Sequence, residues 1–248
     1  MFSRVEAFVS EVREVETEQE LAQALEEVAR DLGFRYFALT HHIDVRRSSA
    51  AIRLHNYPAG WEQWFDTQGL GPTDPVHRAS HMTNVAFRWS SLEKMIPLTP
   101  RDREVLQFAR QEGIGDGCTV PAHVPGETYG SCSFAAETGV TFEPDWLPLA
   151  QLAGGFAFEA ARRIRRIRER DLAAGPGPRL TDRQRECLMW AARGKSDWEI
   201  AQILGVGHET VIRHLKQARE RYGVGKRTLL TVHALFDGTI AFPDVFRR

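Results

Sequence analysis

Apolar residues near the N-terminus follow the spacing of amphipathic helices. Four of them recur every three or four positions and so share one helical face: Val5, Phe8, Val9 and Val12. Thr17 and Glu20 then have the spacing of a capping box, in which each side chain satisfies a free backbone N–H at the start of a helix. This pair predicts a second helix that runs to about Leu32.

The segments that follow carry strand patterns separated by turn residues. A polar turn joins the first two predicted strands, 34–43 and 50–55. The other two, 118–124 and 129–136, form a hairpin around Pro125 and Gly126. Three further stretches predict helices: 58–68, 99–112 and 143–170. Pro58 and Pro100 fall in the first turns of two of these helices, where proline is tolerated. Helices on an antiparallel sheet make an α+β domain, which we expect to be an α/β/α sandwich.

A proline- and glycine-rich stretch, AAGPGPRL at 173–180, cannot continue a helix and predicts a domain boundary. We expect an N-terminal domain over residues 1–172, a linker over 173–179 and a C-terminal domain over 180–248. The C-terminal domain has only short helical patterns: 181–193, 196–204, 208–222 and 226–237. Two of these are joined by LGVG, which is typical of an all-α helix-turn-helix domain.

Composition indicates what class of protein this is and where in the cell it is located. With 42% hydrophobic and 26% charged residues, the chain has the make-up of an ordinary globular protein. It has no run of about 18 apolar residues to span a membrane, and its start lacks the apolar core of a secretion signal. Three cysteines without CxxC spacing argue against disulfides and a zinc finger and favour a reducing, cytoplasmic location.

The net charge of −1 is distributed unevenly. From Arg179 to the end, 13 Lys and Arg stand against 8 Asp and Glu, a net charge of +5, whereas the preceding residues, with 19 against 25, carry −6. A basic C-terminal domain on an acidic body indicates an anionic partner for that domain.

The predicted helix over 208–222 has two different faces. One face is mostly apolar: Val211, Leu215, Ala218 and Tyr222. The opposite face is mainly polar and basic: His208, Glu209, Ile212, Arg213, Lys216 and Arg219. A helix that follows a short turn, packed on one side and basic on the other, suits the major groove of DNA. By charge alone, a solvated surface helix of a small bundle explains the pattern equally well.

The string LTDRQRECLMWAARGKSDWEIAQILGVGHETVIRHL resembles the DNA-binding domain of the LuxR family of bacterial transcription regulators. The likeness covers residues 180–236 and includes Leu188, Gly194, Lys195, the Glu199-Ile200-Ala201 triplet, Leu204, Gly205, Thr210-Val211 and His214-Leu215. It favours DNA as the partner over a plain surface helix. Two positions depart from the family, because Gln184 replaces the usual Glu and Gly207 replaces the usual Ser or Thr.

The resemblance implies DNA contacts for individual residues. Base contacts in the family come from the positions that match Ile212 and Lys216. Lys216 is able to donate to guanine, whereas Ile212 offers only an apolar surface for a thymine methyl. Base readout is then expected from DNA shape or from polar side chains: Lys216, Arg213, Glu209 and His208. Phosphate contacts are expected from three basic residues: Arg219, Lys195 and Arg193.

The stretch HNYPAGWEQWFDTQGLGPTDPV contains a row of aromatic residues followed by a carboxylate. Tyr57, Trp61 and Phe65 are four apart and share a helical face, and Asp74 follows a Gly/Pro turn. An aromatic core face explains this row on its own. Tyr and Trp also carry O–H and N–H donors that need partners when buried, and a buried Asp needs a donor. Together these groups suit a ligand with an apolar body, a hydrogen-bond acceptor and an amide N–H.

A second resemblance spans roughly residues 34–160. The pattern Y-x3-W-x3-F-x8-D-P-V, then F-x-W at Phe87 and Trp89, and EGIGDGCTVPAHVPGETYGSCSF resemble the acyl-homoserine-lactone-binding domain of LuxR-type quorum-sensing receptors. Gly113 and Gly117 match family glycines at which a positive φ or close backbone approach is expected.

This resemblance implies ligand contacts. Trp61 is expected to donate to the lactone carbonyl, Asp74 to accept the amide N–H, and Tyr57 and Ser133 to donate to the acyl carbonyl. Trp89 is expected beside the lactone ring, and Pro75 in the turn that presents Asp74. Candidates for the acyl side, each of which serves equally well as plain core, are Phe37, Leu39, Ile52, Phe65, Val76 and Thr119.

Phe65 departs from its relatives, which commonly have Tyr at this position. Loss of the hydroxyl removes a donor, which disfavours a 3-oxo acyl chain and leaves branched, aromatic or unsubstituted acyl groups.

We therefore predict a cytoplasmic, ligand-responsive transcription regulator. As a homodimer, with the transcription machinery as a further partner and no membrane contact, it would bind a pseudo-palindromic DNA site and control quorum-sensing genes. The expected ligand is an N-acyl- or aryl-homoserine lactone, with no cofactor, metal or catalytic residue. One alternative is a regulator of the same type that responds to a non-lactone molecule. Another is an enzyme acting on an amide or lactone through His41, Cys118 or Cys132.

Overall fold

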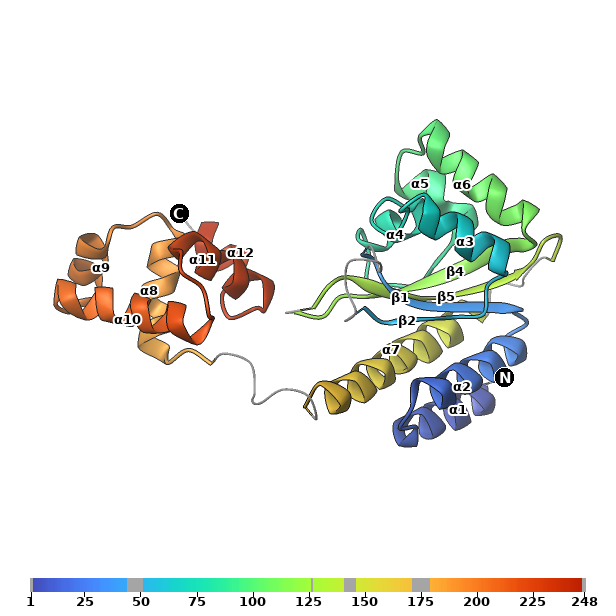
Figure 1. Ribbon diagram of the computed structural model, residues 1–248, viewed down its shortest axis with the longest axis horizontal. Helices are drawn as coiled ribbons and strands as arrows, with labels where there is room; N and C mark the ends of the chain where they lie inside the picture. The colour runs from blue at the N-terminus through green and yellow to red at the C-terminus, as the bar shows by residue number, and fades with distance from the viewer. Residues whose placement is uncertain (1, 44–50, 126, 141–145, 171–178, 247–248) are drawn as a thin grey trace. The chain divides into compact units, whose positions relative to one another are not determined.

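The computed structural model describes residues 2–43, 51–125, 127–140, 146–170 and 179–246. They form two compact units, an N-terminal one described up to residue 170 and a C-terminal one described from residue 179. Figure 1 labels the helices and strands of both units. The predicted linker lies outside the described residues except for Arg179, so the domain boundaries remain a prediction.

The N-terminal unit is built on a five-stranded antiparallel sheet in the order β2-β1-β5-β4-β3. Its strands are β1 (Tyr36–His41), β2 (Arg53–His55), β3 (Phe87–Arg88), β4 (Ile114–Ala122) and β5 (Gly130–Glu137). The predicted hairpin is confirmed as β4 and β5. β1 and β2 fall within the strands predicted over 34–43 and 50–55. Residue 50 lies outside the described part of the chain.

Helices cover both faces of this sheet (Figure 1). One face carries α1 (Phe2–Glu14), α2 (Glu18–Asp31) and α7 (Leu147–Arg170). The other carries α3 (Ala59–Thr67), α4 (Pro75–Ser80), α5 (Leu92–Met95) and α6 (Pro100–Gln111). The predicted α/β/α sandwich is therefore confirmed. The start predicted for the last helix, residues 143–145, lies outside the described residues.

Local sequence explains where these elements begin and turn. Thr17 and Thr99 each form a capping box at the start of α2 and α6. Gly113 has φ +87°, a conformation that side chains rarely adopt, and a Cβ on Gly117 would stand 2.4 Å from the Phe134 carbonyl oxygen. The expectation for these two glycines is thus confirmed.

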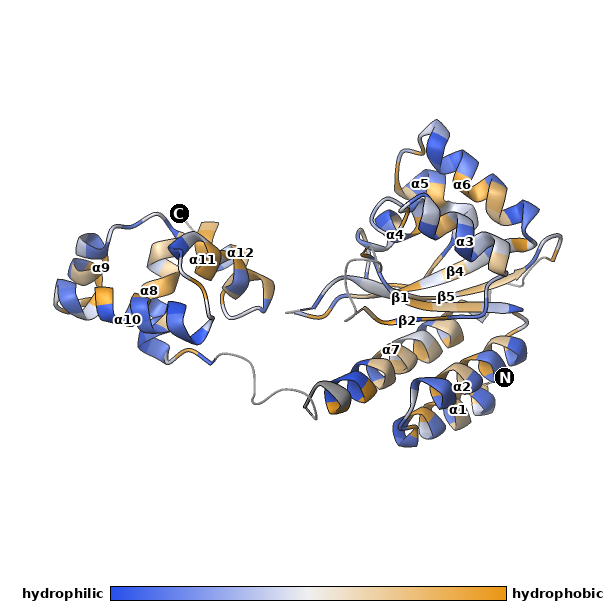
Figure 2. Ribbon diagram, in the orientation of Figure 1, coloured by the Kyte–Doolittle hydropathy of each residue, from blue (hydrophilic) through white to orange (hydrophobic). Residues whose placement is uncertain are grey.

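The main core lies between the sheet and the α1, α2 and α7 layer. Its most enclosed large side chains come from α2 and the central strands: Leu21, Leu25, Phe37, Leu39 and Phe134. In Figure 2 the hydrophobic colour runs along the strands, while the helices carry both colours. This packing leaves the other sheet face to the smaller helices and to a cavity.

The C-terminal unit is entirely helical in its described part. It contains α8 (Asp182–Ala192), α9 (Asp197–Leu204), α10 (His208–Arg221), α11 (Arg227–Phe236) and α12 (Phe242–Phe246). The four predicted helices are confirmed, and α12 is an addition. Ser196 and Glu199 form the capping box of α9, and Gly205 ends that helix in the left-handed conformation with φ +64°. A short turn then connects the end of α9 to the start of α10.

Candidate ligand-binding and DNA-binding sites

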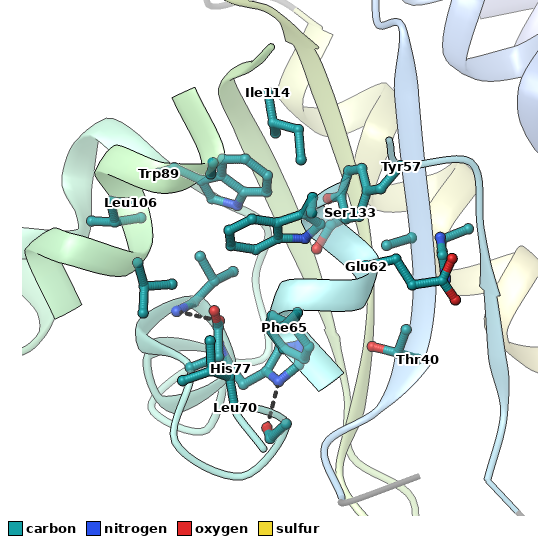
Figure 3. Close-up of a pocket in the computed structure, with 18 of the residues that line it drawn as sticks. Thr40, Tyr57, Glu62, Phe65, Leu70, His77, Trp89, Leu106, Ile114 and Ser133 are labelled. Carbon is teal, nitrogen blue, oxygen red and sulfur yellow. Dashed lines mark hydrogen bonds and ion pairs between the residues drawn. The ribbon is translucent and has the colours of Figure 1, made fainter. Parts of the chain in front are cut away.

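A cavity of about 330 Å³ lies between the sheet and the helices α3, α4 and α6. Figure 3 shows Trp89, Leu106 and Ile114 on one side of it, Thr40 and Glu62 on the other, and Tyr57 and Ser133 between them. The residues predicted for the ligand converge here, since six of the seven line the cavity: Tyr57, Trp61, Phe65, Asp74, Trp89 and Ser133. Pro75 stands behind Asp74 as the first residue of α4.

Asp74 is held in place by the helix that it caps. Its Oδ1 accepts hydrogen bonds from the backbone N–H groups of Val76 (2.8 Å) and His77 (3.0 Å), at the start of α4. The side chain is buried, with 5% of the residue exposed. Both bonds fall on Oδ1, so within the described part of the chain Oδ2 is left as an acceptor beside the cavity.

Tyr57 and Trp61 bring hydrogen-bond donors to the same space. Burial raises the pKa of the Tyr57 hydroxyl well above its usual value, and the Asp74 carboxylate adds to the rise. The hydroxyl therefore stays protonated and is able to donate. Trp61 is buried among Trp64, Phe65 and Phe108, with ring centroids 5.6–6.2 Å away. This packing fixes the direction of its indole N–H.

Ser133 ends a short chain of hydrogen bonds. Trp89 Nε1 donates to Thr119 Oγ1 (2.8 Å), and Thr119 Oγ1 lies 2.8 Å from Ser133 Oγ. If Thr119 donates to Ser133, the Ser133 proton is left to point into the cavity. The cavity thus combines one carboxylate acceptor with donors on Tyr57, Trp61 and Ser133, the set that an amide-linked ligand with two carbonyls requires.

The acyl-side candidates divide between cavity and core. Phe65 and Val76 line the cavity. Three others belong to the main core on the opposite sheet face: Phe37, Leu39 and Ile52. They occupy the alternate positions of β1 and of the segment before β2, which point away from the cavity. Thr119 is fully buried, and its hydroxyl lies within hydrogen-bond distance of Ser133.

Sequence reasoning missed a polar part of the lining: Thr40, Arg53, His55, Glu62, Asp66 and His77. Arg53 bonds Asp66 (2.7 Å) and Glu62 (3.2 Å) across the cavity edge. The available signal was strand alternation, because Ala38 and Thr40 share the face of β1 opposite to Phe37 and Leu39. It identifies Thr40 only once that face is known to carry the cavity.

In the C-terminal unit, α10 presents the side chains predicted for DNA bases. Five of them are exposed: His208, Glu209, Ile212, Arg213 and Lys216. The opposite side of α10 is buried through Val211, Leu215 and Ala218, which pack with α8 and α9. The helix therefore has one face fixed in the bundle and one face open to a partner.

The residues predicted for phosphates are partly engaged within the unit. Arg219 donates to the Gly225 carbonyl (2.9 Å), and Lys195 pairs with Glu199 (3.1 Å). Arg193 donates through Nε to the Asp244 carbonyl (2.6 Å) and lies over the Trp190 ring. Of the three, Arg193 is thus tied to α12, in a contact that links α8 to the end of the described chain.

Comparisons with known proteins agree for both units. Residues 17–161 match the autoinducer binding domain, and residues 178–234 match the bacterial regulatory proteins of the luxR family. The transcriptional activator LuxR of Aliivibrio fischeri is 26% identical over 96% of this chain and 95% of LuxR. The quorum sensing-dependent regulator RpaR of Rhodopseudomonas palustris is 31% identical over 73% of each protein. Escherichia coli SdiA, solved with octanoyl-rac-glycerol, shares the fold, with a TM-score of 0.69 and 22% identity over 97% of this chain and 96% of SdiA.

An autoinducer-binding sandwich followed by a helix-turn-helix unit defines a ligand-responsive, DNA-binding transcription regulator. The chain belongs to the LuxR family of bacterial transcription regulators. Its relatives are regulators and not enzymes, so the enzyme hypothesis is wrong. In agreement, Cys118 and Cys132 are buried, and burial raises the pKa of both thiols, which makes them poor nucleophiles. Among the described residues, no helix is long and apolar enough to cross a membrane.

Proposed function

We propose that this regulator binds an N-acyl-homoserine lactone in the cavity of its N-terminal unit. The observation that carries the proposal is the buried Asp74, whose Oδ2 accepts no hydrogen bond from the described residues and which lines the same cavity as the donors Tyr57 and Trp61. Asp74 accepts the amide N–H, Trp61 donates to the lactone carbonyl, and Tyr57 and Ser133 donate to the acyl carbonyl. Trp89 lies against the lactone ring.

The ligand acts through folding and through a dimer. It fills a cavity that would otherwise hold water against apolar side chains, and so stabilises the folded unit by linkage. Two chains in the cytoplasm then pair and place their α10 helices in successive major grooves of a pseudo-palindromic site in quorum-sensing promoters. Lys216, Arg213, Glu209 and His208 read bases or groove shape, Ile212 offers apolar contact, and Arg219 and Lys195 add phosphate contacts.

The test is a thermal melt of the full chain with and without a panel of acyl- and aryl-homoserine lactones. Asp74→Asn is the informative variant, because an Asn oxygen still caps α4 while its NH₂ group opposes the amide N–H of the ligand. We expect a ligand-induced rise in Tm of several degrees in the wild-type protein and little or none in Asp74→Asn.

Asp74→Ala is the matched comparison, since it removes the cap as well. Loss of the cap should reduce the unfolding free energy of the free protein by about 1 kcal/mol and so lower its Tm. Asp74→Asn keeps the cap and should not lower the Tm in this way. An equal ligand response in the wild-type protein and in Asp74→Asn would remove Asp74 from the site.

A second candidate ligand is a non-lactone molecule. The SdiA structure of the same fold holds octanoyl-rac-glycerol, which has an acyl chain and hydroxyl groups but no lactone or amide. A Tm rise with acyl glycerols and none with any lactone would favour this function for the chain.

A further inference from the structure

The cavity floor is polar where the sheet continues past Ser133. Ala38 and Thr40 of β1 line the cavity, and strand pairing places Ser133 beside Ala38 and Arg53 beside Thr40. Successive side chains on one face of an antiparallel strand are about 7 Å apart. Thr40 and Arg53 therefore lie one step, about 7 Å, beyond the row that holds Ser133.

Thr40 brings a hydroxyl group to the cavity lining. In the described part of the chain it has no hydrogen-bond partner. Figure 3 shows its oxygen pointing toward the side of the cavity that Phe65 occupies. Ser131, its neighbour on β5, differs because its Oγ lies 2.9 Å from His42 Nε2. A molecule that covers Thr40 without a polar atom would strand this hydroxyl away from water.

The wall beside Thr40 is an ion-pair cluster that links β2 to α3. Arg53 binds Asp66 and Glu62, and His55 Nε2 lies 3.3 Å from the Glu62 carboxylate. Burial lowers the pKa of His55, and the Glu62 carboxylate partly offsets this effect. A plain alkyl end against this wall would displace its water and return no hydrogen bond.

Rings and size limit the acyl group further. Phe65 and His77 line this end with ring centroids 6.1 Å apart, edge to face. A cavity of 330 Å³ is near the lower end of small-molecule pockets, which start at about 300 Å³. The space beyond Ser133 thus suits a compact group between rings, with a polar tip.

We propose that this end of the cavity selects an acyl group that carries a hydroxyl about 7 Å beyond its carbonyl, bound by Thr40 beside the Arg53 cluster. This inference rests on the proposed function, because it takes the acyl carbonyl to be at Ser133. A 3-oxo group lies only two bonds from that carbonyl and does not reach Thr40. A 4-hydroxyphenylacetyl group has about the required length and the flat shape.

The test uses ligand pairs that differ only in the tip. The first pair is 4-hydroxyphenylacetyl- and 4-methylphenylacetyl-homoserine lactone, and the second is 6-hydroxyhexanoyl- and heptanoyl-homoserine lactone. Dissociation constants are measured for the full chain by titration, or by competition if the protein must be purified with ligand. We expect the hydroxyl member of at least the flat pair to bind about tenfold more tightly, the effect of one well-made hydrogen bond.

Thr40→Val keeps the shape and removes the hydroxyl. We expect it to reduce the preference to about twofold or less, by weakening the hydroxyl ligand and sparing the methyl one. Thr67→Val is the matched control, because Thr67 is exposed on α3 and its hydroxyl bonds the Gln63 carbonyl outside the cavity. It should leave the preference unchanged.

The outcomes separate this inference from the proposed function. Equal or tighter binding of the methyl members, or a hydroxyl preference that survives Thr40→Val, overturns the inference and leaves lactone binding standing. Failure of every lactone in the panel to bind removes the proposed function and the inference with it.

Discussion

Ser133 depends on a residue that never reaches the cavity. Thr119 is fully buried, accepts the Trp89 indole N–H and lies within hydrogen-bond distance of Ser133. The Thr119 hydroxyl keeps its own proton after accepting the indole N–H, and when it donates this proton to Ser133, the Ser133 proton faces the ligand. One buried hydroxyl thereby sets the orientation of Trp89 and the donor role of Ser133.

Replacing Thr119 by Val should expose this dependence. The Trp89 N–H loses its acceptor, and an unsatisfied buried donor costs about 1–3 kcal/mol. We expect a lower Tm of the free protein and ligand binding weakened by about tenfold or more, measured by titration. Thr119→Ser retains the oxygen and should bind ligand nearly as the wild type does. Wild-type affinity in Thr119→Val would mean that Ser133 needs no such support.

Among the elements, α4 has a second attachment besides its cap at Asp74. His42, just after β1, lies with Nδ1 2.9 Å from His81 Nε2 and stacks on His77 at 3.9 Å between ring centroids. Its Nε2 contacts Ser131 of β5. Burial lowers the pKa of His42 far below its usual value, and His77, His81, His41 and His123 add to this effect. The cluster thus packs α4 on the sheet only while His42 is neutral.

Acid should therefore weaken the N-terminal unit. The unfolded chain takes up a proton on His42 below about pH 6.5, whereas the folded chain does not, so the unfolding free energy falls as the pH drops. The loss of unfolding free energy due to His42 approaches about 1.4 kcal/mol per pH unit well below pH 6.5. At pH 7.5 and above, His42 causes essentially no loss. Urea unfolding at pH 7.5, 6.5 and 5.5 measures the slope. His42→Gln should reduce it, and exposed His208→Gln on α10 should not; equal slopes in all three proteins would contradict this account.

Sequence patterns located the long elements better than the short ones. Capping boxes at Thr17, Thr99 and Ser196 mark helix starts by local hydrogen bonds alone. The short elements α4, α5, β3 and α12 have at most six residues, too few for a period, and depend on tertiary packing.

The same distinction holds within the cavity. The aromatic row and Asp74 stand out because their side chains are unusual in one short segment. Thr40 and Arg53 do not stand out, since their role follows from strand pairing, which brings residues 13 positions apart to one floor. Residues such as Phe37 and Leu39 look equally suitable in sequence, and only the sheet's orientation assigns them to the core.

At the scale of the whole molecule, the residues proposed for ligand binding and for DNA binding are separate. The cavity lining falls between Ala38 and Ser133, and the exposed face of α10 falls between His208 and Lys216. The charge follows the same division, with −6 before Arg179 and +5 from there on. Substitutions on α10 should therefore impair DNA binding in the intact protein without changing ligand binding.

Lys216→Ala tests whether a substitution on α10 affects DNA binding alone. It removes a side chain proposed to read a base, which should cost about 1–3 kcal/mol in affinity for a site that the wild-type protein has selected from random DNA. The ligand-induced rise in Tm should remain as in the wild type, because the cavity is intact. Asp74→Asn should lose the Tm rise and, because the proposed ligand acts through folding and pairing of the full chain, also the ligand-dependent part of DNA binding. Lys94→Ala, an exposed lysine on α5, controls for the loss of one positive charge. DNA binding reduced equally by Lys94→Ala and Lys216→Ala would indicate general electrostatic attraction rather than base readout by α10.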